Sequence, residues 1–213
     1  MRNNSLIKKI VFYVEKLPYF GVENLKILEI PSYYLRIALS RLETRGEIVR
    51  LKKGFYSSKK FIEKTKIEGK FSYFLEFLTS KIYSPSYLSL EYILYENNIL
   101  TEIPQNFTLV TKNKTATFSN KLGIFIYHKM KDTLFFGFKI IKNGDFLVYK
   151  AEKSKALFDF LYLRKGIILN KEMAQELRLN LENFNRQDKK KLMEYVDLEG
   201  SKRMKEVYSF LFK

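Results

Sequence analysis

The chain has 213 residues, with 39 Lys and Arg against 23 Asp and Glu, and its net charge is +16. It contains one His and no Cys, which excludes disulfides and thiolate metal sites and argues against a histidine-based metal centre. The basic excess indicates a polyanionic partner, with nucleic acid first. No apolar run approaches the ~20 residues of a membrane span, so we expect a cytoplasmic protein that binds no membrane.

The N-terminal part of the sequence predicts three helices followed by a hairpin. Apolar residues at helical spacing predict a helix over residues 5–17, and "VENLKIL" predicts a short helix over residues 22–28. A third helix follows Pro31 and ends at Gly46, and "EIVRLKKGFYS" indicates two short strands around a Lys-Lys-Gly turn. This order is typical of the winged helix-turn-helix, so we predict such a DNA-binding domain over residues 1–60.

The third helix of that plan lies in the major groove of DNA, so its solvent-facing side must carry groups that reach bases and phosphates. Apolar residues at helical spacing assign the opposite side to the core: Leu35, Ala38, Leu39 and Leu42. The residues predicted to contact DNA are Ser32, Tyr33, Arg36, Ile37, Ser40 and Arg41 on the helix and Arg50, Lys52 and Lys53 on the hairpin. The first sixty residues hold thirteen Lys and Arg against five Asp and Glu, which favours this interface.

The rest of the chain predicts an α+β domain over residues 61–213. A charged stretch over residues 59–70 is typical of a helical linker or hinge, and amphipathic helices are predicted over residues 71–82 and 87–100. Short runs rich in Phe, Tyr, Ile, Val and Thr follow, separated by Asn, Gly and Lys turns. They predict a mostly antiparallel sheet, and helices return from Ser154 onward. The whole chain is therefore expected to be α+β, a winged helix-turn-helix followed by a sheet flanked by helices.

Several motifs in this second part occur in a characteristic order. Their residues are Tyr87, Ser89 and Leu94; Val110, Thr111 and Lys112; Tyr127 and His128; the "LFFG" run from Leu134 to Gly137; and Lys155, Ala156, Leu157, Asp159 and Leu161. With the N-terminal plan, this order resembles the antitoxin and transcriptional-regulator family of AbiE-type (abortive infection) type IV toxin–antitoxin systems. The resemblance extends to about Arg164. One departure is Ser154, which stands where the family usually has an acidic residue.

The resemblance implies a function for each part of the chain. The N-terminal domain would bind an operator with inverted repeats in double-stranded DNA and repress its own operon. The C-terminal domain would counteract a co-encoded nucleotidyltransferase-like toxin, by opposing its effect rather than by a tight complex. Lys155 and Asp159 are the candidate partner or antitoxin residues. No enzymatic activity, cofactor or metal is expected.

Other readings of the sequence stay open. A metal-dependent nuclease or other nucleic-acid-processing enzyme would need clustered carboxylates, for which Asp145, Glu152 and Asp159 are the candidates. Alternatively, the N-terminal helices form an interaction module that binds no DNA. Asp159, in an apolar helix, is expected to form a structural ion pair more readily than a partner contact. His128 lacks an apparent catalytic partner and is expected to be structural.

Overall fold

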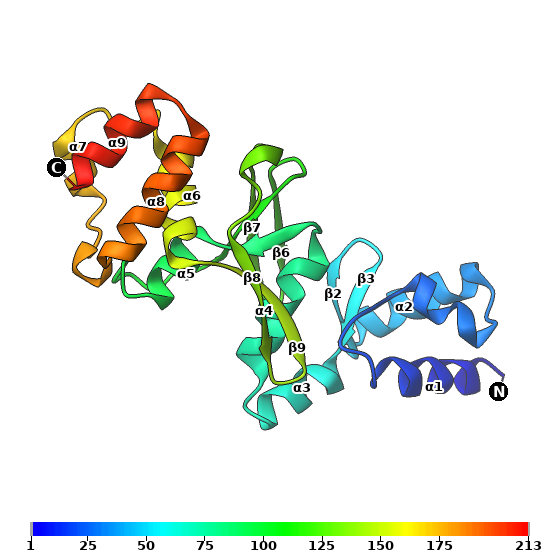
Figure 1. Cartoon of the computed structure of the whole chain (residues 1–213). Helices are drawn as coiled ribbons and strands as arrows, with labels where there is room; N and C mark the ends of the chain where they lie inside the picture. Colours follow the sequence, from blue (N-terminus) through cyan, green and yellow to red (C-terminus); the bar gives the residue numbers. More distant parts are fainter. Residues whose placement is uncertain (1, 213) are drawn as a thin grey trace.

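The computed structural model describes residues 2–212, and its N-terminal part (blue to cyan in Figure 1) combines helices with a small sheet. The elements are α1 (Arg2–Val14), β1 (Phe20–Gly21), the 3₁₀ helix η1 (Val22–Leu28), α2 (Ser32–Thr44), β2 (Ile48–Lys52) and β3 (Phe55–Ser58). The three strands pair antiparallel in the order β1-β3-β2. The turn between β2 and β3 contains Gly54 at φ 74°, a left-handed conformation that glycine adopts without steric cost.

Helix α2 forms where its apolar spacing predicts. Its buried residues are Leu35, Ala38, Leu39 and Leu42, the four that the sequence assigned to the core. They pack with Ile10 and Val14 of α1, with Phe20 and with Tyr56, so that the N-terminal elements share one apolar core. Packing this stripe inward leaves the opposite side of α2 to solvent.

The second part of the chain is α+β, as predicted. Its elements are α3 (Lys59–Ile67), α4 (Phe71–Ile82), β4 (Ser86–Leu88), α5 (Leu90–Glu96), β5 (Phe107–Thr111), β6 (Ala116–Asn120), β7 (Gly123–Lys129), η2 (Asp132–Leu134), β8 (Phe138–Asn143), β9 (Phe146–Ala151), α6 (Lys153–Arg164), α7 (Lys171–Glu176), η3 (Leu181–Asn183), α8 (Arg186–Glu199) and α9 (Lys202–Phe212). Figure 1 shows the sheet in the middle of the molecule, with the N-terminal helices at one end and α6 to α9 at the other. Within the described residues, no helix combines the length and apolar character needed to cross a membrane.

The larger sheet has the strand order β6-β7-β5-β4-β9-β8 and is mixed. The pairs β6–β7, β4–β5 and β8–β9 are antiparallel, whereas β5–β7 and β4–β9 are parallel. The parallel β5–β7 pair arises because β6 lies at the sheet edge and β7 returns between β6 and β5. The sheet is therefore mostly antiparallel, as the sequence predicted, although two of its five strand pairs are parallel.

The single helix predicted over residues 87–100 is wrong at its start. Residues Ser86–Leu88 form strand β4, and helix α5 begins only at Leu90. Tyr87 and Leu88 are fully buried, and the backbone of β4 pairs with β5 and β9. Pairing on both sides in the sheet centre outweighs the helical spacing of the apolar side chains.

Direct contacts join the N-terminal elements to the larger sheet. The side-chain amide of Asn120 donates a hydrogen bond to the Leu51 carbonyl (3.1 Å). The ring of Phe77 on α4 packs against Tyr19 (5.8 Å between centroids), which itself packs on Phe55. The stretch predicted as a linker contains helix α3, and its Ile62 is buried in the larger core. Residues 59–70 therefore pack against the second part of the chain and do not form a free linker.

Candidate nucleic-acid interface

The solvent-facing side of α2 carries the polar and basic residues that the sequence singled out. The exposed residues are Ser32, Tyr33, Arg36, Ile37, Ser40 and Arg41. Tyr33 is 70% exposed and Ile37 is 45% exposed, so both side chains can be reached by a ligand. Among the described residues neither arginine has an ion-pair partner. Both guanidinium groups are therefore available to an anionic ligand.

The N-terminal end of α2 adds a second feature suited to anions. Its first turn has no acidic residue, and Pro31, at the N-cap, offers no side-chain cap. The first N–H groups of a helix lack intrahelical acceptors, and the helix dipole places partial positive charge there. Ser32 adds an exposed hydroxyl at the same end. A phosphate oxygen would satisfy these donors.

Of the three hairpin residues predicted to contact DNA, two face solvent and one does not. Arg50 on β2 and Lys53 in the turn are exposed. Lys52, however, points to the second part of the chain, where its ammonium donates a hydrogen bond to the Ile82 carbonyl and lies 5.5 Å from the Phe55 ring centroid. Burial lowers the pKa of Lys52. The structure therefore brings Arg50 and Lys53, but not Lys52, to the solvent side of the hairpin.

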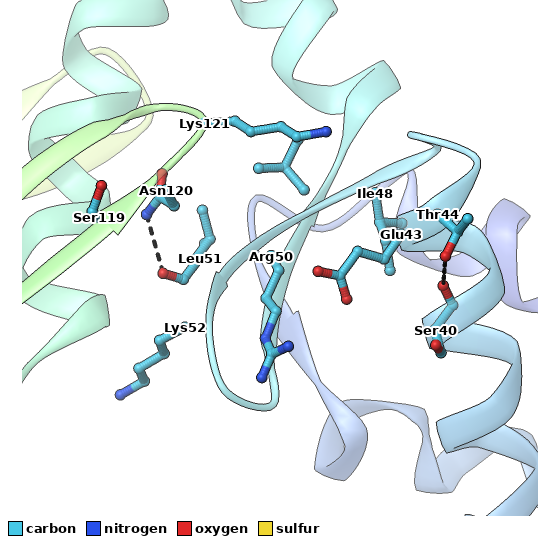
Figure 2. Close-up of a pocket in the computed structure, with 11 residues that line it drawn as sticks. Ser40, Glu43, Thr44, Ile48, Arg50, Leu51, Lys52, Ser119, Asn120 and Lys121 are labelled. Atoms are coloured by element: carbon cyan, nitrogen blue, oxygen red, sulfur yellow. Dashed lines mark hydrogen bonds between the residues drawn. The ribbon is translucent and has the colours of Figure 1, made fainter.

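A groove of about 680 Å³ lies beside this surface, between the N-terminal elements and the larger sheet (Figure 2). Its lining residues are Ser40, Glu43, Thr44, Ile48, Val49, Arg50, Leu51, Lys52, Ser119, Asn120 and Lys121. Glu43 extends from α2 toward Arg50, as Figure 2 shows, and is the one carboxylate among these residues. The groove thus joins the exposed side of α2 to the turn between β6 and β7.

Lys155 and Asp159, the candidate partner residues, lie elsewhere and are fully buried. They form an i, i+4 ion pair with 2.5 Å between the Lys155 ammonium and Oδ1 of Asp159. The other carboxylate oxygen, Oδ2, accepts hydrogen bonds from the Tyr87 hydroxyl (3.0 Å) and the Ser89 hydroxyl (2.8 Å). Neither charged group reaches the surface, so neither is placed to touch a partner; the ion pair expected of Asp159 is confirmed.

Three of the motifs that carry the family resemblance meet at this buried pair. Tyr87 and Ser89 come from one motif, Gly137 from a second, and Lys155 and Asp159 from a third. A side chain at Gly137 would lie 3.0 Å from the stem of Lys155 and from the Tyr195 hydroxyl. Burial raises the pKa of Asp159, and the Lys155 charge opposes that rise. Three donors around one carboxylate fit its ionised form.

The carboxylates considered for a nuclease are dispersed. Asp145 is exposed and pairs with Lys70 (3.2 Å), and Glu152 pairs with Lys139 (3.0 Å) and Lys191. These pairs hold the pKa of Glu152 below its usual value against the opposing effect of burial. In the described part of the chain, no group of three or more His, Asp or Glu side chains is placed to hold a metal ion. His128, half-buried on β7, has its pKa lowered by burial.

Sequence reasoning missed the contribution of the β6–β7 turn to the groove. Ser119, Asn120 and Lys121 line it, although they lie far from α2 in the sequence. A signal was present, because the segment between Glu102 and Asp132 contains five lysines and no Asp or Glu. Only the fold could show that this basic segment adjoins the N-terminal elements.

Comparison with known proteins identifies no family for this chain. No protein-family model matches the chain, and no curated protein matches it either.

Proposed function

We propose that the chain is a DNA-binding transcriptional autorepressor and the antitoxin of a type IV, abortive-infection toxin–antitoxin system. Its N-terminal part would act as a winged helix-turn-helix with α2 in the major groove and the β2–β3 hairpin over the flanking backbone. The observation that carries this proposal is the exposed side of α2, where Arg36 and Arg41 form no ion pair with any residue that the structure describes.

The residues on this surface suit the separate tasks of DNA recognition. Arg36 and Arg41 can form bidentate hydrogen bonds to guanine or phosphate, and Ile37 can contact a thymine methyl. Ser32 and the first N–H groups of α2 can hold a phosphate, while Arg50 and Lys53 contact the backbone beside it. The net charge of +16 favours association with DNA and predicts affinity that falls steeply with salt.

The antitoxin half rests on the family resemblance. It is supported by the convergence of three of its motifs on the Lys155–Asp159 pair, which gives them a shared place in the fold. Because these residues are buried, we assign them to the stability of the C-terminal part and not to contact with a toxin. The proposed partner is a co-encoded nucleotidyltransferase-like protein.

A competition binding measurement tests the repressor half. A fluorescent duplex from the region upstream of the chain's own gene is titrated with the full-length protein, with scrambled duplex as competitor, at two salt concentrations. The proposal predicts preference for the upstream duplex and a steep loss of affinity with salt. Equal affinity for both duplexes, or none for either, would contradict it and favour an interaction module.

Co-expression tests the antitoxin half separately. The full-length chain should restore growth to cells that express the neighbouring nucleotidyltransferase-like gene. Arg36→Ala should lose repression of a reporter but keep growth rescue, because Arg36 is part of α2, which lies at the opposite end of the molecule from helices α6 to α9 (Figure 1). Growth arrest unaffected by the chain would remove the antitoxin assignment.

A further inference from the structure

The outer side of strand β6 continues the surface formed by α2 across the groove. Exposed residues alternate along this edge strand and at its two ends, namely Thr115, Thr117, Ser119 and Lys121, and the residues between them are partly buried. Ser119 and Lys121 open into the same groove as Ser40 and Thr44 of α2. One continuous face therefore includes both parts of the chain.

The chemistry of this strand suits a phosphate backbone. Side-chain hydroxyl and ammonium groups form contacts to DNA phosphates that do not depend on the base sequence. Within the described residues, Lys121 has no ion-pair partner, and the segment from Glu102 to Asp132 contributes five lysines with no carboxylate between those two residues. A surface of this sign attracts a polyanion such as the phosphate backbone of DNA.

A hydrogen bond links β6 to β2, the strand that follows α2. Asn120 donates to the Leu51 carbonyl (3.1 Å), while its side-chain oxygen accepts from the Leu122 amide (2.8 Å). The same asparagine thus holds both the turn that carries Lys121 and strand β2 of the hairpin. Figure 2 shows this bond between Asn120 and Leu51, with Lys121 among the other residues that line the groove.

We propose that β6 is a second backbone-binding element, which holds double-stranded DNA beyond the base pairs contacted by α2. This inference rests on the proposed function and extends it to the α+β part of the chain. Lys121 would neutralise a phosphate, and the hydroxyls of Thr117 and Ser119 would donate hydrogen bonds to phosphate oxygens. Strand β6 spans roughly 17 Å, which corresponds to about five base pairs of added contact.

Two lengths of the upstream duplex test this extension. The longer duplex adds about ten base pairs at each end, so that it covers β6 in either orientation. Wild-type protein should bind it more tightly than the shorter one, with a steeper salt dependence. Lys121→Ala should remove that gain and lower the salt slope by about one on the longer duplex, while leaving the shorter duplex almost unaffected.

The charge-matched control is a lysine on a helix far from α2. Lys171→Ala removes an exposed lysine on α7, at the far end of the molecule from α2, and should match wild type on both duplexes. If wild type prefers the upstream sequence but Lys121→Ala equals it at both lengths, the β6 inference fails and the proposed function stands. If wild type shows no sequence preference at either length, both fail together.

Discussion

The ammonium group of Lys52 donates a hydrogen bond to the backbone carbonyl of Ile82, the last residue of α4. The next residue, Lys53, is exposed at the tip of the hairpin. Two adjacent lysines of one hairpin thus have different roles: Lys52 joins the hairpin to the second part of the chain, and Lys53 presents charge to solvent.

Lys52→Met tests this division. Methionine keeps an apolar stem near Phe55 but leaves the Ile82 carbonyl without its donor, so the free energy of unfolding should fall by about 1 kcal/mol. The salt slope of DNA binding should be unchanged. Denaturant unfolding and duplex titration measure the two effects, with Lys53→Met as the control that should show the reverse: unchanged stability and a slope lower by about one. A lower slope for Lys52→Met would place its charge at the DNA.

Asp159→Ala should destabilise the protein strongly. It leaves the buried Lys155 ammonium without its counter-charge and removes the acceptor of Tyr87 and Ser89, so we expect a loss of about 3–5 kcal/mol in the free energy of unfolding. The paired replacement Lys155→Met with Asp159→Leu should cost less, because no charge then stays buried. Thermal and denaturant unfolding compare the variants. A single variant as stable as wild type would show that the pair is not structural.

Gly137→Ala and Gly46→Ala separate backbone strain from packing. The two glycines have nearly equal φ values, 75° and 72°, but only Gly137 has Lys155 and Tyr195 atoms 3.0 Å from an added Cβ. Both variants should lose about 1 kcal/mol from conformational strain, and Gly137→Ala should lose more because the buried lysine must shift. Equal losses in parallel unfolding curves would argue that Lys155 moves freely.

Glu43→Gln should strengthen DNA binding. Glu43 is the carboxylate in the groove beside Arg50, and removing one negative charge about 7 Å from a phosphate is worth roughly 0.6 kcal/mol in water, or about threefold in affinity. Titration with the longer upstream duplex measures the gain, with Glu172→Gln on distant α7 as the control. Unchanged affinity would mean that the DNA does not pass the groove.

Local patterns in the sequence predicted much of the N-terminal fold. The apolar spacing of α2 identified its four buried residues, and Gly54 marked the hairpin turn, because both features depend on residues close together in the chain. The same spacing misled at Tyr87, where strand pairing on both sides decides the structure. Parallel pairing of β5 with β7 likewise depends on which strands become neighbours.

Contacts between distant residues account for what the sequence did not predict at the site. Lys52 and Lys53 are indistinguishable in the sequence, and only the docking of the hairpin on α4 separates them. Lys150 pairs with the buried Glu76 at 2.6 Å, although 74 residues separate them, and neither had stood out. The groove needs the β6–β7 turn, which local periodicity cannot bring next to α2.

The most direct test of the account is to compare wild type, Arg36→Ala and Lys53→Ala on the upstream and scrambled duplexes across a salt series, with Lys171→Ala as control. The account predicts that Arg36→Ala weakens binding to the upstream duplex by about 1–3 kcal/mol and relaxes the preference for it. Lys53→Ala should weaken binding to both duplexes alike and lower the salt slope by about one. Wild-type affinity and preference in both variants would contradict the claim that the exposed side of α2 and the adjoining hairpin bind DNA.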